Sequence, residues 1–276
     1  MKKLILIGLF SCGISTIKAQ NSMMFDNLFI EGLSNFALSS IDTAPQVQFL
    51  YSNVDLLGGA QNHSVATGQF SYKSMVYGVQ AGIQNYQGID HTVAQVNVGR
   101  SYQINAHSGL SFSVNGGFYQ RQFEAPNAQT EFDQAIREQM DYTNVYGGFS
   151  VGYAYKDLNV GLSSGDLFNT SLDKSASWNL QADYTVDVLD SVIVLKPMLN
   201  VNQGYDLDGP IAMIGLNTVL NKYVTTTMGY YTNESIHLGM GILVDKLSIN
   251  YRFRYYHSAF REIKGGQNII QLNYRF

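Results

Sequence analysis

The sequence predicts an all-β protein, a transmembrane antiparallel outer-membrane β-barrel of about 14 strands. Three features predict it: an amphipathic strand at the carboxy terminus, an export signal at the amino terminus, and a composition rich in aromatic residues and glycine. In the last strand Ile270, Leu272, Tyr274 and Phe276 share one face, and the residues between them are polar. An apolar face that ends in an aromatic residue suits lipid, and a polar opposite face suits a barrel interior.

Residues 1–19 are interpreted as a signal peptide that is cleaved after Ala19, because Lys2 and Lys3 precede a short apolar run. That run is too short to cross a bilayer as a helix. An alternative is a lipoprotein box at 9–12, which places lipid on Cys12. Cleavage after Ala19 removes the one cysteine of the chain, and with it any disulfide, thiol nucleophile or cysteine metal site.

The composition fits a large β structure with a polar interior. The chain has 19 Tyr, 15 Phe and 26 Gly but only 4 Pro, and 14% of its residues are charged. Tyrosine suits a membrane interface, and glycine on a strand leaves room inside a barrel. The net charge of −4 gives no reason to invoke nucleic acid. No stretch after the signal is apolar for long enough to form a membrane helix, so the exported chain is either a secreted β domain or a barrel surrounded by outer-membrane lipid.

Residues 20–43 precede the predicted strands and form a periplasmic amino-terminal segment or plug. The segment has a mixed apolar stretch in which Phe25 and Phe29 are candidate partner-binding residues. It either fills the barrel mouth or serves as a simple tether, and the sequence leaves both open.

The barrel itself is predicted over 44–276, from fourteen runs of period-2 alternation. The runs are 45–54, 62–73, 75–84, 91–102, 109–121, 143–156, 158–164, 176–187, 191–202, 210–220, 223–231, 235–244, 247–256 and 267–276. Longer connections at 55–61, 85–90, 122–142, 165–175, 203–209 and 257–266 alternate with tight ones. With both ends of the chain in the periplasm, every long connection is extracellular.

The connection 122–142 has apolar residues at helical spacing, among them Phe132 and Ile136. It is predicted as a short helix over the extracellular mouth. The helix either packs against its own loop or offers these two residues to a partner.

The positions of arginine residues along the alternating strands indicate which face is the inner one. An arginine that faces lipid at mid-bilayer costs about 2–4 kcal/mol, so Arg252 and Arg254 are predicted to point into the lumen, as are Arg121 and Arg275. Further bases with lumen parity are Lys73, Arg100, Lys156 and Lys196. Such bases either pair with lumen acids such as Asp183 and Asp187 or line an anion-preferring pore.

The carboxy-terminal third carries motifs in a recognisable order: Leu195–Asn200, Tyr205–Asp208, Met228–Tyr231, Leu247–Tyr251 and Gly265–Tyr274. Their order resembles the PorP/SprF family of type IX secretion and gliding-motility membrane proteins of Bacteroidetes. Residues 24–28, Met-Phe-Asp-Asn-Leu, are similar to an early motif of that family. The chain departs from the family where an asparagine-proline-alanine segment and a glycine usually follow, because 33–38 has neither.

The resemblance implies a non-enzymatic barrel in the cell outer membrane that assists type IX secretion or gliding. It implies a secreted adhesin or a periplasmic peptidoglycan-associated lipoprotein as partner, and it transfers no site residue. The residues agree that catalysis is not indicated: the five histidines are scattered, and no His/Asp/Glu group has metal-site spacing. We therefore expect no catalytic residue, no cofactor and no metal. The alternative function is a general or anion-preferring diffusion porin.

Overall fold

The computed structural model describes the strands, their tight turns and a short stretch of the amino-terminal segment. The described residues are 35–39, 41, 44–56, 59–86, 89–123, 141–169, 177–189, 192–203, 210–232, 235–256 and 263–276. The predicted signal peptide, the predicted helix over the mouth, and the candidate partner-binding residues Phe25, Phe29, Phe132 and Ile136 lie outside these ranges.

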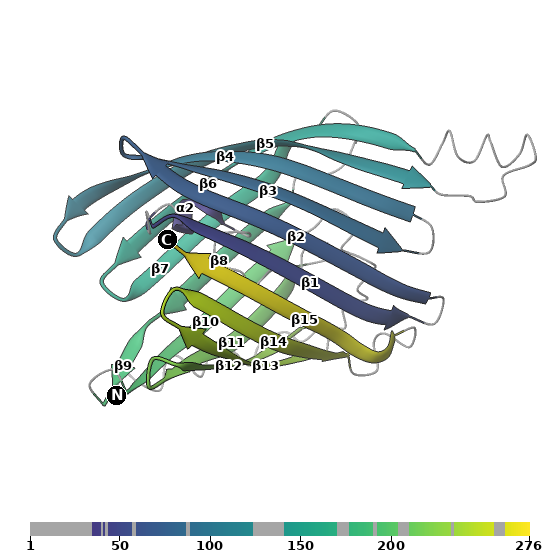
Figure 1. Cartoon of the computed structure of the whole chain (residues 1–276). Helices are drawn as coiled ribbons and strands as arrows, with labels where there is room; N and C mark the ends of the chain where they lie inside the picture. The colour runs from purple at the N-terminus through teal and green to yellow at the C-terminus, as the bar shows by residue number, and fades with distance from the viewer. Residues whose placement is uncertain are drawn as a thin grey trace, which may run out of the picture.

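One sheet of fifteen strands makes up the fold of the described residues (Figure 1). The first seven are β1 (Gln46–Leu56), β2 (Gly59–Tyr72), β3 (Met75–Tyr86), β4 (Ile89–Asn105), β5 (Ser108–Phe123), β6 (Tyr142–Tyr155) and β7 (Leu158–Asn169). The others are β8 (Trp178–Tyr184), β9 (Val186–Val188), β10 (Ile193–Gln203), β11 (Ile211–Leu220), β12 (Val224–Tyr231), β13 (Ser235–Val244), β14 (Leu247–Tyr256) and β15 (Ile263–Arg275).

The sheet closes into an antiparallel barrel. β15 pairs with β1 from Gln46↔Arg275 to Val54↔Gln267, and β10 pairs with β11, so neither β1 nor β11 is an open edge. Both β8 and β9 pair with β10 and occupy one place in the ring, so the strands fill fourteen places. The predicted count is confirmed. The prediction of a single strand over 176–187 was wrong in detail, since the strand is interrupted at Thr185.

Alternating side chains give the wall two chemically distinct faces. On β13, Ile236 and Met240 are 43% and 68% exposed on the outer face, whereas Ser235 and His237, which flank Ile236, are buried on the inner face. On β15, Ile270, Leu272 and Tyr274 are exposed outside, and Gln271 is buried inside. In lipid the backbone groups must be paired within the protein, and the apolar side chains must face outward. The period-2 reading of the sequence is therefore confirmed.

The two ends of the barrel differ. One end, here the terminus end, carries the start of β1, the end of β15 and the tight turns at 73–74, 106–107, 156–157, 221–223 and 245–246. At the first of these turns Lys73 and Ser74 both have positive φ, 49° and 65°, as a two-residue type I′ hairpin requires. The opposite end is the loop end. The predicted long connections at 55–61 and 85–90 were wrong there, because β1 reaches Leu56, β2 begins at Gly59, β3 reaches Tyr86 and β4 begins at Ile89.

A glycine shapes the loop end of the closing strand. The β1–β15 register shifts between Val54 and Leu56, and Gly266 lies opposite this irregularity with φ +102°. A Cβ at Gly266 would come closer than 3.0 Å to the carbonyl oxygen of Arg254 on β14 and to the Phe253 ring. Only glycine adopts this conformation without strain and allows the two backbones to approach this closely.

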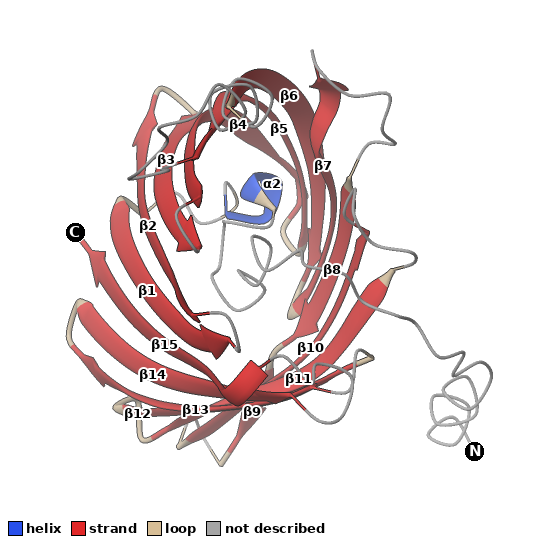
Figure 2. Ribbon diagram, turned by 90° about the vertical axis from the view of Figure 1, so that its right-hand side faces the viewer, coloured by secondary structure: helices blue, strands red, loops and turns tan. Residues whose placement is uncertain are grey.

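The short helix α2 (Phe36–Ser39) lies inside the ring of strands, as the view along the barrel in Figure 2 shows. It contacts β4, β5, β6 and β7. Within the described part of the chain, no helix has the length and apolar character that a membrane crossing requires.

Candidate functional site

The inner wall of β5, β6 and β7 is built for close approach. Its inward positions include Ser111, Ser113, Ser150, Gly152 and Gly161, which are all buried. These residues are register neighbours: Ser111 pairs with Gly152, Ser113 with Ser150, and Gly152 with Gly161. Small residues on adjacent strands let another segment approach the wall closely, and α2 packs against them.

Two serines bind the backbone of Ala37 in α2. The Ala37 N–H donates to Ser150 Oγ at 3.0 Å, and Ser111 Oγ donates to the Ala37 carbonyl at 2.6 Å. Ser113 and Ser150 hydrogen-bond each other through their hydroxyls, so the Ser150 side chain is itself held in place. Because Ala37 is 0% exposed, its backbone groups are shielded from water, and the two serines supply hydrogen bonds to them.

The glycines of the wall make room for the side chains of the helix. A Cβ on Gly161 would lie 2.7 Å from Leu38 Cγ, and one on Gly152 would lie 3.1 Å from Leu38 Cδ2. On β3, a Cβ on Gly78 would lie 2.7 Å from Phe36 Cζ. We call the surface formed by Gly78, Ser111, Ser150, Gly152 and Gly161 the helix seat.

Asn35 begins the helix. Its side-chain Oδ1 accepts a hydrogen bond from the Leu38 N–H at 3.2 Å, which is the contact of an N-cap residue. Asn35 is 1% exposed, and a Cβ on Gly161 would also crowd its amide. A four-residue helix is not stable by itself, so the cap and the seat must hold α2 in place.

The opposite part of the inner wall is basic and aromatic. Arg252 and Arg254 of β14 and His237 of β13 are buried there, and His237 pairs in register with Arg254. The Arg254 guanidinium lies 3.9 Å from the centroid of the Tyr231 ring and 4.9 Å from that of Tyr256. Stacking on aromatic faces favours arginine over lysine at such a position.

A hydrogen-bonded chain continues from this cluster across the strands that close the barrel. Arg254 Nε donates to Ser235 Oγ at 2.9 Å, and the Tyr256 hydroxyl donates to Gln267 Oε1 on β15 at 3.1 Å. Gln267 Nε2 then donates to Ser52 Oγ on β1 at 2.7 Å. Inner side chains therefore join β14, β15 and β1 in addition to the backbone ladder, at the place where the two ends of the sheet meet.

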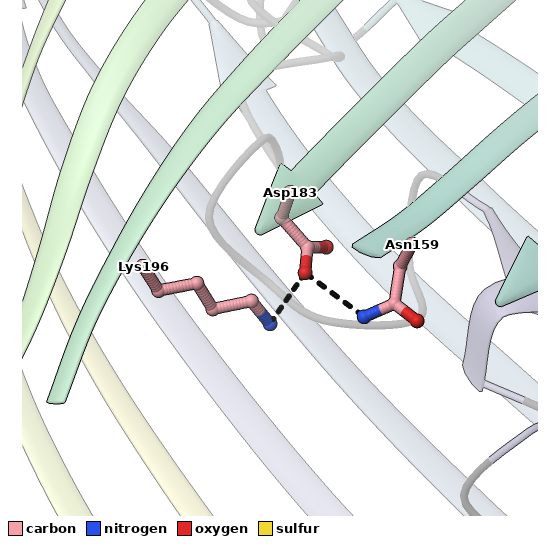
Figure 3. Close-up of polar contacts among 3 residues, drawn as sticks. All are labelled: Asn159, Asp183 and Lys196. Carbon is pink, nitrogen blue, oxygen red and sulfur yellow. Dashed lines mark hydrogen bonds and ion pairs between the residues drawn. The ribbon is translucent and has the colours of Figure 1, made fainter. Parts of the chain in front are cut away.

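An ion pair stands on a third part of the wall (Figure 3). Lys196 Nζ of β10 lies 3.4 Å from Asp183 Oδ1 of β8, and the Asn159 amide of β7 donates to the same oxygen at 2.9 Å. The pairing of a lumen base with Asp183 is as predicted. Asp183 is almost fully buried, whereas the Lys196 side chain is one quarter exposed.

The predicted lumen arginines occupy different surroundings. Arg252 and Arg254 are in the basic cluster, and Arg121 lies on the inner face of β5 opposite His91, which contacts the Tyr119 hydroxyl. Arg275 is exposed at the terminus end, opposite Gln46. The parity argument was wrong for Arg100: its guanidinium stacks on the outward-facing Tyr102 at 4.9 Å from the ring centroid.

The sequence reading missed the helix seat. The available signal was the alternation of serine and glycine at the inward positions of 109–117, 146–152 and 159–163. No group of three or more His, Cys, Asp or Glu among the described residues is placed to hold a metal ion. The inner wall offers two kinds of interaction. The helix seat forms hydrogen bonds with peptide backbone, and the basic cluster of Arg252, Arg254 and His237 can bind anionic groups or stack on aromatic rings.

Comparison with protein families gives one match over nearly the whole chain. The family described as "Type IX secretion system membrane protein PorP/SprF" matches residues 21–274. A comparison with curated proteins finds no match.

Solved structures of similar shape are membrane barrels. The P. putida toluene transporter TodX is 10% identical, with a TM-score of 0.54 and coverage of 88% of this chain and 93% of that chain. The CymD monoaromatic hydrocarbon channel is 8% identical, with a TM-score of 0.54 and coverage of 95% and 94%. CdiB from Acinetobacter baumannii is 9% identical, with a TM-score of 0.53, and this chain covers 60% of it. At these identities the likeness shows the fold alone, and fold and family together place the chain in the outer membrane.

Proposed function

Because this chain belongs to the PorP/SprF family of type IX secretion system membrane proteins, we propose that it is a non-enzymatic accessory of type IX secretion or gliding motility that binds a protein. The partner is a secreted adhesin or a periplasmic anchor protein. The terminus end faces the periplasm, and the loop end faces outward, as in barrels with short periplasmic turns.

The observation that carries this proposal is the seated helix. A peptide segment fixed inside the barrel narrows the lumen, which limits free diffusion, and it gives a scaffold a defined inner surface. The segment is fixed by two hydrogen bonds to the Ala37 backbone and by the burial of Asn35 and Ala37. The basic cluster and the Lys196–Asp183 pair add cross-strand contacts that stiffen the wall.

Affinity purification tests partner binding. The tagged protein is extracted from outer membranes in detergent, and proteins that co-purify are identified by mass spectrometry. A matched control is an unrelated barrel with the same tag, expressed to the same level. The proposal expects enrichment of a secreted adhesin or of a periplasmic anchor protein with this chain only. Equal recovery with both barrels contradicts it.

The second candidate function is an anion-preferring porin, which the buried Arg252, Arg254 and His237 favour. Planar bilayers with purified protein separate the two functions. The scaffold is expected to be nearly silent. Steady conductance with a reversal potential that indicates anion preference, together with no co-purifying protein, supports the porin instead.

A further inference from the structure

The helix seat forms its hydrogen bonds with the main chain of the segment that it holds, not with the side chains. Ser150 Oγ accepts the Ala37 N–H, and Ser111 Oγ donates to the Ala37 carbonyl, so both backbone groups of one residue are read by two side chains. Ser111 Oγ also lies 3.2 Å from the Gly152 carbonyl, and the Ser113 hydroxyl contacts Ser150. The two serines are therefore oriented by the barrel wall, whatever side chain the bound residue carries.

Selectivity follows from the space around this backbone clamp. The central residue is Ala37, which is fully buried, so a larger side chain does not fit there. On one side the Phe36 ring occupies the place that a side chain at Gly78 would take, and on the other Leu38 fills the places left by Gly152 and Gly161. The seat thus fits an aromatic residue, a small residue and an aliphatic residue in that order.

We propose that the helix seat is a peptide-binding site, which the chain's own residues 35–38 occupy and which also takes an aromatic–small–aliphatic segment of a protein client. This inference rests on the proposed function, because it names what part of the client enters the barrel. The binding is non-covalent, and the client segment replaces the chain's own segment in the same contacts.

Tethering sets the competition between the two occupants. Only a few residues join α2 to β1, so the chain's own segment is present at an effective concentration of roughly millimolar. A free client segment at micromolar concentration must bind about a thousandfold more tightly to displace it, unless the client is itself held at the barrel by other contacts. Exchange is therefore expected when the chain's own segment is weakened or when the client is already docked.

The test uses the full chain and a fluorescent peptide with the sequence of residues 33–41. The variant Ala37→Trp weakens the chain's own occupant, since tryptophan does not fit a fully buried alanine site. Fluorescence anisotropy in detergent should show at least tenfold tighter peptide binding to this variant than to the wild type. The milder Phe36→Ala, which removes the ring over Gly78 and nothing from the wall, should act in the same direction.

Three controls make the result decisive. A peptide with tryptophan in place of its alanine should bind neither protein, and adding Ser111→Ala and Ser150→Ala to the Ala37→Trp chain should weaken peptide binding about tenfold or more. A peptide of unrelated sequence with the same aromatic–small–aliphatic order should bind within about tenfold of the first. Equal binding to wild type and both weakened variants, or equal binding of the tryptophan peptide, overturns the site. Binding of the chain's own sequence alone overturns the client's part in it.

The two tests fail in different ways. Co-purification of a protein with no peptide binding keeps the proposed function and removes this inference. Peptide binding to the seat with no co-purifying protein removes the proposed function and the client's part in this inference, and keeps only the peptide-binding seat.

Discussion

A single methyl group at Gly161 should release α2 and leave the barrel intact. A Cβ at this position would lie 2.7 Å from Leu38 Cγ and 2.8 Å from Leu38 Cδ1, and its other near neighbour is the Asn35 amide. All three atoms belong to the amino-terminal segment and none to the wall. In Gly161→Ala the Asn35 and Leu38 side chains, or the segment that carries them, must therefore shift, while the strand pairing of β7 with β6 and β8 has no reason to change.

The expected magnitude follows from overpacking. Forcing an extra methyl into a packed site costs about 1–3 kcal/mol, which lowers the ratio of seated to released segment by about 5- to 150-fold at about 1.4 kcal/mol per tenfold. If the added methyl shifts the segment within the seat, the two hydrogen bonds to Ala37, each worth about 0.5–1.5 kcal/mol, are weakened in the seated state. The larger end of the range applies if both bonds break there.

Amide hydrogen exchange measures this ratio directly. The Ala37 N–H, which donates to Ser150 Oγ, should exchange about 5- to 150-fold faster in Gly161→Ala, with no change in the β6 and β7 amides. The matched control is Gly109→Ala, where a Cβ meets only the Tyr102 carbonyl oxygen at 3.6 Å, an ordinary contact. Unchanged exchange at Ala37 in Gly161→Ala, or equal acceleration in both variants, would refute the account of the seat.

Three further predictions concern the stability of the wall. Arg254→Ala should lower the free energy of unfolding of the barrel by about 2–4 kcal/mol, because it removes a charge-assisted hydrogen bond to Ser235 and the stacking on two tyrosines. Urea unfolding in detergent measures this loss, and a loss below about 0.5 kcal/mol contradicts the stabilising role of Arg254. Gly266→Ala should lower the heat-modifiable fraction in outer membranes, because alanine is strained at φ +102°, and an unchanged yield speaks against that strain. Lys196→Met should destabilise the barrel by about 1–3 kcal/mol, less than for a fully buried pair because Lys196 is partly exposed. Adding Asp183→Leu should recover part of this loss. If urea unfolding shows no recovery in the double variant, the stabilising role of the ion pair is contradicted.

The sequence predicted the wall because the wall follows a local rule. Alternation with period 2 assigns each residue to a face, and the strand from Ser235 to Val244 obeys it at every position that decides the face. Turn residues were equally readable where two residues had to close a hairpin, as at Lys73 and Ser74. Arg100 also obeys the rule, since it lies on the outer face with Val96 and Tyr102; the expectation that this base faces the lumen was wrong, and its guanidinium stacks on the Tyr102 ring instead.

The site was less predictable because it depends on contacts between distant segments. The hydrogen bond from Ala37 to Ser150 joins residues 113 apart in the sequence, and no local sequence pattern predicts it. A four-residue helix also lacks the periodicity that identifies longer helices. Serine and glycine at Ser111, Gly152 and Gly161 indicated a wall with spare room, but only the fold indicates that residues 35–38 fill it.

Surface display of adhesins is the most direct measurement of the central claim, that this barrel serves type IX secretion by binding a protein. The gene is deleted, and secreted adhesins are followed on intact cells by whole-cell labelling, with the wild-type gene restored as a control. The account predicts that display of at least one adhesin falls in the deletion strain and returns on complementation, while total outer-membrane protein is unchanged. Normal display of every adhesin in the deletion strain, with small solutes passing through the purified barrel, would contradict it.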